Sequence, residues 1–118
     1  MAISAKNGSA LLSELTDDAT LSSNLFDKPI QGREAVIRTM QTISSFYKID
    51  TVAYRHRVAK REFVFSNAIL ANGDGAEVMT VGIRDGTGWI CALSMEHSPR
   101  RAAKVLAAQV AAALAEMP

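Results

Sequence analysis

Alternation between apolar and polar residues dominates the second half of the chain. From Ile49 the period is two, which places Val52, Tyr54, His56 and Val58 on one face of a strand. Turn sequences rich in Asn, Asp and Gly separate the β-rich runs that follow, at 62–71, 76–84 and 89–97. Such short links join antiparallel neighbours, so the pattern predicts an antiparallel meander.

A helical period appears before and after these strands. One apolar stripe predicts a helix over 33–47, formed by Val36, Met40, Ile43 and Tyr47. A shorter helix, capped by Asn7 or Ser9, is expected to run through Leu15 and to end at residues 16–18, with an extended segment over 19–23. Ser98 and Pro99 begin a last helix, and the whole pattern predicts an α+β fold.

Composition narrows the class of protein. A length of 118 residues fits one domain, and 13 Lys and Arg nearly balance 12 Asp and Glu, which argues against nucleic acid and anionic membranes as partners. The single Cys91 excludes an intramolecular disulfide and a multi-cysteine zinc site. No signal-peptide block or apolar run long enough to cross a bilayer is present, so the expected location is the cytoplasm.

The segment from Leu11 to Met40, LLSELTDDATLSSNLFDKPIQGREAVIRTM, resembles the front end of the nuclear transport factor 2-like superfamily, which includes SnoaL-like polyketide cyclases and ketosteroid isomerases. The resemblance implies a strongly curved antiparallel sheet wrapped around helices, a cystatin-like cone with an internal pocket, and homodimers formed through the outer sheet face. It covers residues 7–97 of a single domain that spans 1–118. The family's long first helix is missing, and we expect the helix in 98–118 to replace it, in the same chain or swapped from a partner.

The resemblance also permits a test of the ketosteroid isomerase mechanism. Ungapped superposition puts Ser23 at the position of the general base and Thr80 at about the position of the sheet Asp, and the helix that carries the family's Tyr is absent. A hydroxyl cannot replace a carboxylate base near neutral pH, so that mechanism is disfavoured. Asp27 is the nearest carboxylate; it is either a catalytic acid or a turn residue, and the turn is favoured.

Two histidines are candidates for acid–base chemistry. His56 either faces the pocket or occupies a partly buried strand position. His97 ends the last strand in phase with Leu93 and Met95, and its family position lies near the pocket mouth; a surface or helix-capping role is the alternative. With so few histidines and no Cys cluster, no metal motif and no cofactor are indicated.

Basic and aromatic residues give further candidates. Arg55 and Arg57 share a strand face and could clamp a carboxylate or phosphate, although a solvated outer face is favoured. Apolar residues in strand phase either line a ligand cavity or form core and dimer interface; they are Phe63, Phe65, Ile69, Trp89, Leu93 and Met95.

These observations predict a pocket that binds a small, largely apolar organic molecule, with isomerase, cyclase or hydrolase activity as the possible chemistry. The alternative is a non-catalytic dimerisation or ligand-sensing module of the same fold. Catalytic candidates are His97, His56 and Asp27. The residues expected to contact ligand are Ser23, Asn24, Tyr54, Thr80, Trp89, Leu93 and Met95.

Overall fold

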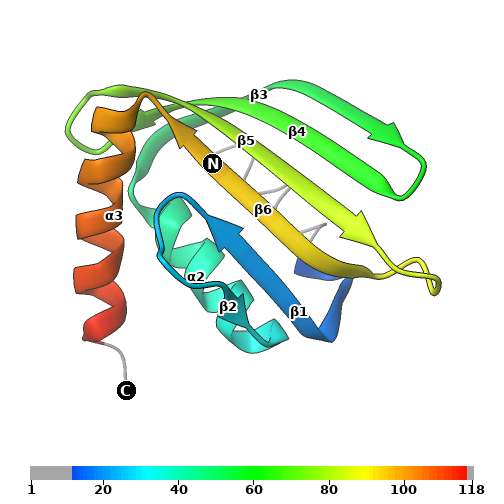
Figure 1. Ribbon diagram of the computed structural model, residues 1–118. Coiled ribbons are helices and arrows are strands. Elements are labelled where there is room, and N and C mark those ends of the chain that lie inside the picture. The colour runs from blue at the N-terminus through cyan, green and yellow to red at the C-terminus, as the bar shows by residue number, and fades with distance from the viewer. Residues whose placement is uncertain (1–11, 117–118) are drawn as a thin grey trace.

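The computed structural model describes residues 12–116, in which one mixed sheet packs against two helices (Figure 1). The first strands are β1 (Leu15–Ser23) and the short β2 (Ile30–Gln31), followed by helix α2 (Arg33–Ser45). Four long strands then form the meander that the turn sequences predict: β3 (Tyr47–Val58), β4 (Arg61–Leu70), β5 (Gly75–Arg84) and β6 (Ile90–Ser98). The chain continues into helix α3 (Arg100–Ala115).

The strand order is β2-β1-β6-β5-β4-β3, and one pairing departs from the antiparallel expectation. β1 runs parallel to β6, while all consecutive strands of the meander are antiparallel. A parallel pair needs a long crossover, and here α2 and the meander itself supply it. The sequence period of two predicts strands but carries no information about this distant partner.

The N-terminal boundary also differs from the expectation. Leu12 is helical, the expected cap residues lie outside the described part of the chain, and Leu15 already belongs to β1. Residues 16–18 therefore lie in a strand and do not end a helix. The buried side chains of Leu15, Ala19 and Leu21 pack into the core, whereas Asp17 points outward and pairs with Arg33 at 2.9 Å. Tertiary burial of three apolar residues overrides the local helical spacing.

Helix α2 buries the predicted stripe but is shorter than predicted. Val36, Met40 and Ile43 are buried, and the helix ends at Ser45 with Phe46 as its C-cap. Tyr47, expected on the same stripe, is the first residue of β3 instead. Its side chain thus belongs to the sheet and not to the helix.

Helix α3 confirms a helix after Pro99 and packs within this chain. It contacts α2 and β6, at the end of the sheet where β6 stops (Figure 1). Its buried residues are Ala102, Ala103, Leu106 and Val110. The small alanines allow close approach, and the larger Leu106 is fully buried in the core. Whether this helix substitutes for the family's first helix stays a prediction. No helix within residues 12–116 is long and apolar enough to cross a membrane.

Two register shifts in β3 set the direction of its side chains. Val52 pairs with Ser66 but Tyr54 pairs with Phe65, so Ala53 is an extra residue without a partner. Such a β-bulge bends the strand and reverses the side-chain alternation beyond it. The uninterrupted face predicted for Val52 to Val58 is therefore wrong.

The bulge divides β3 into two segments in which the even-numbered side chains point to opposite faces of the sheet. Val52 faces the core side of the sheet together with Ser66, whereas Tyr54 and His56 face the outside, opposite Phe65 and Phe63. Beyond the bulge, Arg55 and Arg57 turn to the core side, opposite Val64 and Glu62. The expectation that the two arginines are solvated on an edge strand is therefore confirmed, whereas their placement on the outer face is wrong.

Candidate functional site

Several polar side chains lie on the face of the sheet that packs against the helices, among apolar neighbours. Directly paired residues project from the same face, so the registers of β3 to β6 group them. The apolar members include Val64, Val78, Leu93 and Met95. The polar members are Asp50, Glu62, Ser66, Thr80 and His97, all buried. Because buried polar groups need partners, this set is the first place to look for chemistry.

His97 is the centre of the first group. Its residue is only 2% exposed, and its Nε2 lies 2.5 Å from the hydroxyl oxygen of Tyr47, which starts β3. Burial lowers the pKa of His97 to about 4, so the imidazole is neutral at pH 7. Its Nδ1 is buried without a hydrogen-bond partner among the described residues, whichever tautomer is present.

The position of His97 is fixed from the neighbouring loop by Asn24. The Asn24 Nδ2 donates to the carbonyl oxygen of His97 over 2.7 Å, and the His97 backbone N–H donates to Asn24 Oδ1 over 3.0 Å. β1 ends at Ser23, opposite Met95, so beyond this point the Asn24 side-chain amide replaces the backbone hydrogen bonds that a longer β1 would make to β6. The Ser23 hydroxyl accepts a hydrogen bond from the Leu25 backbone N–H over 3.1 Å and so shapes the same loop.

Tyr47 remains protonated in this environment. Burial, with a further contribution from the charge of Asp50, raises the pKa of Tyr47 far above its ordinary value of 10.0. Its hydroxyl can therefore donate to His97 Nε2, which leaves the proton of the neutral imidazole on Nδ1. In that arrangement Nδ1 is an N–H donor that no described residue accepts.

Asp50 is the second buried group without a partner. The residue is 2% exposed, and neither carboxyl oxygen forms a hydrogen bond of acceptable geometry with the described residues. Burial raises the pKa of Asp50 to about 6, and the nearby Ser66 hydroxyl opposes this only in part. A carboxyl group that titrates near neutrality can both take and give a proton at physiological pH.

The structure groups some candidate residues with His97 and separates others. Thr80, Leu93 and Met95 are buried on its face of the sheet, and Asn24 and Ser23 lie at the adjoining loop. Others lie elsewhere. Tyr54 and His56 stack on the outer face with ring centroids 6.0 Å apart, Asp27 is exposed in a turn, and Trp89 is exposed in the β5–β6 turn.

Sequence reasoning missed Tyr47 and Asp50. Tyr47 fits the helical stripe of α2, so its place in the sheet gave no signal. Asp50 did leave one, because it is two residues from Val52 and lies in strand phase with it. An acid in the buried phase of a strand is unusual and marks a functional candidate.

A second polar group, which we call the Arg84 cluster, comprises Arg84, Glu62, Glu14, Arg55 and Arg57. The Arg84 guanidinium donates two hydrogen bonds to Glu62, from Nε to Oε1 over 3.0 Å and from Nη2. Its Nη1 donates to the Gly88 carbonyl oxygen over 2.7 Å, and its Nη2 also forms an ion pair with Glu14 over 2.7 Å. The Arg55 Nη2 lies 3.6 Å from Glu62 Oε2. The cluster thus ties β3, β4 and β5 to the start of β1.

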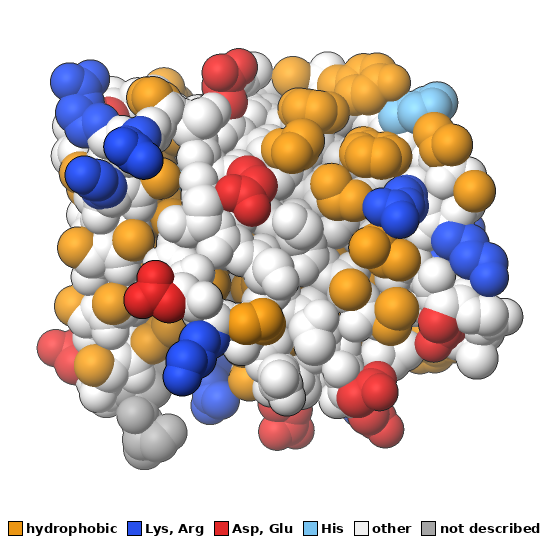
Figure 2. Space-filling view, viewed as in Figure 1, with side chains coloured by type: hydrophobic (Ala, Val, Ile, Leu, Met, Phe, Trp, Pro, Cys, Tyr) orange, Lys and Arg blue, Asp and Glu red, His pale blue; other side chains and the backbone are white. Residues whose placement is uncertain are grey.

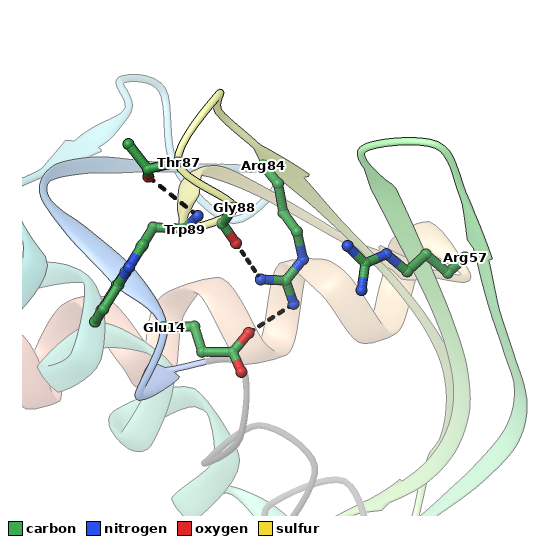
Figure 3. Close-up of a pocket in the computed structure, with 6 residues that line it drawn as sticks. All are labelled: Glu14, Arg57, Arg84, Thr87, Gly88 and Trp89. Atoms are coloured by element: carbon green, nitrogen blue, oxygen red, sulfur yellow. Dashed lines mark hydrogen bonds and ion pairs between the residues drawn. The ribbon is translucent and has the colours of Figure 1, made fainter.

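Electrostatics keep this cluster ionised. Burial by itself would raise the pKa of Glu62, but the hydrogen bond and charge of Arg84, with the charges of Arg55 and Arg57, bring it below 4.5. The bond to Glu62 likewise raises the pKa of Arg84. Beside the cluster lies an open pocket of about 430 Å³, lined by Glu14, Arg57, Arg84, Thr87, Gly88 and Trp89 (Figure 3).

The two groups lie at opposite ends of the sheet. Val78 pairs with His97, and Arg84 lies six positions further along β5, which corresponds to about 20 Å along a strand. They are therefore separate sites. Within residues 12–116, no three His, Cys, Asp or Glu side chains come together in a way that could hold a metal ion.

Comparison with known proteins identifies the fold. No protein-family model and no curated protein matches the sequence. Among solved structures, an uncharacterised protein with a cystatin-like fold from Silicibacter pomeroyi DSS-3 is similar with a TM-score of 0.84 at 13% identity, covering 92% of this chain and 76% of that one. A steroid delta-isomerase from Pseudomonas aeruginosa gives a TM-score of 0.81 at 18% identity, covering 91% and 79%.

A protein from Jannaschia sp. CCS1 assigned to the SnoaL-like polyketide cyclases is also similar, with a TM-score of 0.65 at 9% identity and coverage of 85% and 78%. The chain therefore has the nuclear transport factor 2-like, or cystatin-like, α+β fold. At these identities the likeness is one of fold and does not carry a reaction.

Proposed function

We propose that this protein binds a small, largely apolar organic molecule on the helix-facing side of its sheet and moves a proton on it, as an isomerase or cyclase does. One observation carries the proposal. The carboxyl group of Asp50 and the Nδ1 of His97 are both buried, neither has a hydrogen bond of good geometry among the described residues, and both lie on a largely apolar face that also carries Ser66 and Thr80. A ligand with one polar oxygen and an apolar body would satisfy them.

The proposed roles follow from the protonation states. Asp50, with a pKa near 6, is largely a carboxylate at pH 7 and would take a proton from a carbon next to a carbonyl and return it at another carbon. The neutral His97, held by Tyr47, would donate from Nδ1 to the carbonyl oxygen as negative charge develops there. Thr80, Leu93 and Met95 would contact the apolar body of the ligand.

Proton transfer can be detected without knowing the substrate. A panel of aromatic and polyketide-like ketones is incubated with the protein in D₂O, and deuterium incorporation next to the carbonyl is followed by mass spectrometry. We expect some members to exchange faster with the wild type and to raise its melting temperature, and we expect Asp50→Asn to remove the exchange.

Asp27→Asn is the matched control, since it makes the same substitution at an exposed turn. Exchange that survives in Asp50→Asn, or a panel without any stabilisation or exchange, contradicts the proposal. His97→Gln should lower the rate and leave some exchange, because it removes the oxyanion donor but not the base.

A second proposal, homodimer formation through the outer face of the sheet, rests on exposed apolar side chains. Ile49, Tyr54, Val58 and Phe65 are 53%, 50%, 52% and 41% exposed. Figure 2 shows hydrophobic side chains gathered over this part of the surface. A contiguous apolar patch on a small chain is typical of an interaction surface, and a second copy buries it symmetrically.

The association state tests the dimer. By light scattering after gel filtration, we expect a wild-type dimer that Phe65→Glu converts to a monomer with an intact fold. Asn67→Glu is the control, because Asn67 is exposed in the same strand phase of β4 and is already polar. A monomeric wild type at high micromolar concentration would rule this interface out.

A further inference from the structure

One wall of the pocket beside the Arg84 cluster carries a cation, Arg57, whose charge acts on Glu62, its neighbour across the strand pair, without a direct contact. Within residues 12–116 no hydrogen bond or ion pair ends on the Arg57 guanidinium, although Arg84 and Arg55 both pair with Glu62. Arg57 reaches in from β3 with its guanidinium pointing toward that of Arg84 (Figure 3). The Glu62 carboxylate reduces the repulsion between these two cations, but its oxygens contact Arg84 and Arg55, so an anion in the pocket would reduce the repulsion further.

Charge counting gives the size of the imbalance. The lining residues hold two guanidinium groups, from Arg57 and Arg84, and one carboxylate, from Glu14, so two minus one leaves one net positive charge on the pocket wall. The pKa of Glu62 is lowered and that of Arg84 raised, so these two groups are ionised at neutral pH. The pocket is therefore matched to a single negative charge.

The carboxylate of Asp85 in the neighbouring loop does not line the pocket. Asp85 accepts hydrogen bonds from the Thr87 backbone N–H over 2.9 Å and from the Thr87 hydroxyl, so its carboxylate is used inside the β5–β6 turn. The Gly88 carbonyl is held by Arg84. These contacts fix the loop that carries Trp89, which borders the pocket on the opposite side of Glu14 from Arg57 (Figure 3).

The donors favour a carboxylate over a phosphate. The planar guanidinium fork of Arg57 matches the two oxygens of a carboxylate. A phosphate monoester carries about two negative charges and would place the second one beside Glu14 and Glu62. The 430 Å³ volume exceeds what a carboxylate alone needs, and the indole of Trp89 offers a surface for an aromatic or apolar body.

We propose that this pocket is a second ligand site that binds a small organic monocarboxylate, with the carboxylate on Arg57 and the organic part near Trp89. The site does not depend on the chemistry proposed for Asp50 and His97, because about 20 Å of strand separates them. The proposal also narrows the anion site that the sequence indicated for Arg55 and Arg57: Arg57 would bind the carboxylate, whereas Arg55 already pairs with Glu62.

The chain provides its own reporter. Trp89 is the single tryptophan of the 118 residues and it lines this pocket, so its fluorescence reports occupancy directly. Benzoate is the probe, benzamide the neutral analogue of the same shape, and inorganic phosphate the competing anion. We expect a saturable change of Trp89 emission with benzoate, weakened by added salt, and no saturable change with benzamide.

Variants assign the site to Arg57. Arg57→Gln should weaken benzoate binding at least tenfold, and Arg57→Lys should weaken it less, because the charge remains but the fork is lost. Arg61→Gln is the control, since it removes the same charge from the same hairpin while Arg61 is exposed on the outer face, opposite Val58. Melting temperatures verify that each variant is folded.

Three results would overturn the proposal: a wild type without a saturable response, equal binding of benzoate and benzamide, or undiminished binding by Arg57→Gln. Tighter binding of phosphate than of benzoate would overturn the assignment to a carboxylate. If Arg57→Gln did not fold, the wild-type comparison of benzoate with benzamide would still decide. Loss of proton transfer in Asp50→Asn should leave benzoate binding unchanged.

Discussion

Removing the charge of Asp50 should stabilise the protein at neutral pH. The pKa of Asp50 is about 6 in the folded chain against an ordinary value of 3.8, and a difference of one pKa unit corresponds to about 1.4 kcal/mol. Below about pH 3 the group is protonated in both the folded and the unfolded state, so it does not change the free energy of unfolding. As pH rises to about 6 the unfolded chain loses the proton first, and about 3 kcal/mol of stability is lost.

Asp50→Asn cannot ionise, so it should escape this loss. The free energy of unfolding of the variant minus that of the wild type should grow by up to about 3 kcal/mol between pH 4 and pH 7. Urea denaturation followed by circular dichroism at several pH values measures it. Asp27→Asn, at an exposed turn, provides the baseline. A difference that stays constant with pH, or that falls as pH rises, would refute an elevated pKa at Asp50.

His97 should show the opposite sign. Its pKa is about 4 when folded against 6.5, so the unfolded chain binds the proton first and stability falls as pH drops from about 6.5 to 4, by about 3 kcal/mol. The two groups therefore nearly cancel in the wild type over this range. In Asp50→Asn only the His97 effect remains, so the free energy of unfolding should fall as pH drops from about 6.5 to 4. In His97→Gln only the Asp50 effect remains, so the free energy of unfolding should fall as pH rises toward 7.

Three further substitutions test the framework around the sites by the same denaturation assay. Asn24→Ala removes both hydrogen bonds to the backbone of His97 and should cost about 1–3 kcal/mol; no loss would mean that the loop does not hold that residue. Arg84→Met leaves the buried Glu62 carboxylate without its main partner and should lower the free energy of unfolding by about 3 kcal/mol at pH 8. The loss should be smaller near pH 4, and smaller in the double variant with Glu62→Met. Equal losses at both pH values would count against an ionised pair. Leu106→Ala in α3 should cost about 2–5 kcal/mol, because the side chain is fully buried, whereas a negligible change would mean that this helix is not docked on the sheet.

The sequence predicted the meander and its turns because local chemistry determines them. The Asn-Gly sequence at 72–73 and the Asp-Gly sequence at 85–86 fix where β4, β5 and β6 begin and end. The helix in α2 was predictable for the same reason, since its apolar stripe is local. The parallel pairing of β1 with β6 was not, because it joins segments about seventy residues apart and no local preference encodes it.

The candidate site was predictable only in part. His97 was found because it lies in phase with Leu93 and Met95 on an unbroken strand. Its partner Tyr47 was missed because helical and strand spacing both fit that residue. The faces of Arg57 and His56 were assigned wrongly because an extra residue at Ala53 is set by pairing across the sheet, and neither Gly nor Pro marks it.

The extra residue Ala53 determines which side chains of β3 point to each face of the sheet. Because of that one residue, a single strand delivers aromatic side chains to the surface proposed for self-association and a guanidinium to the pocket proposed for a carboxylate. If Ala53 were instead paired regularly, the alternation would exchange the two sets and bury Tyr54 where Arg55 now lies. Deletion of Ala53 would leave both sets on the faces they now occupy and would remove only the bend that the extra residue produces.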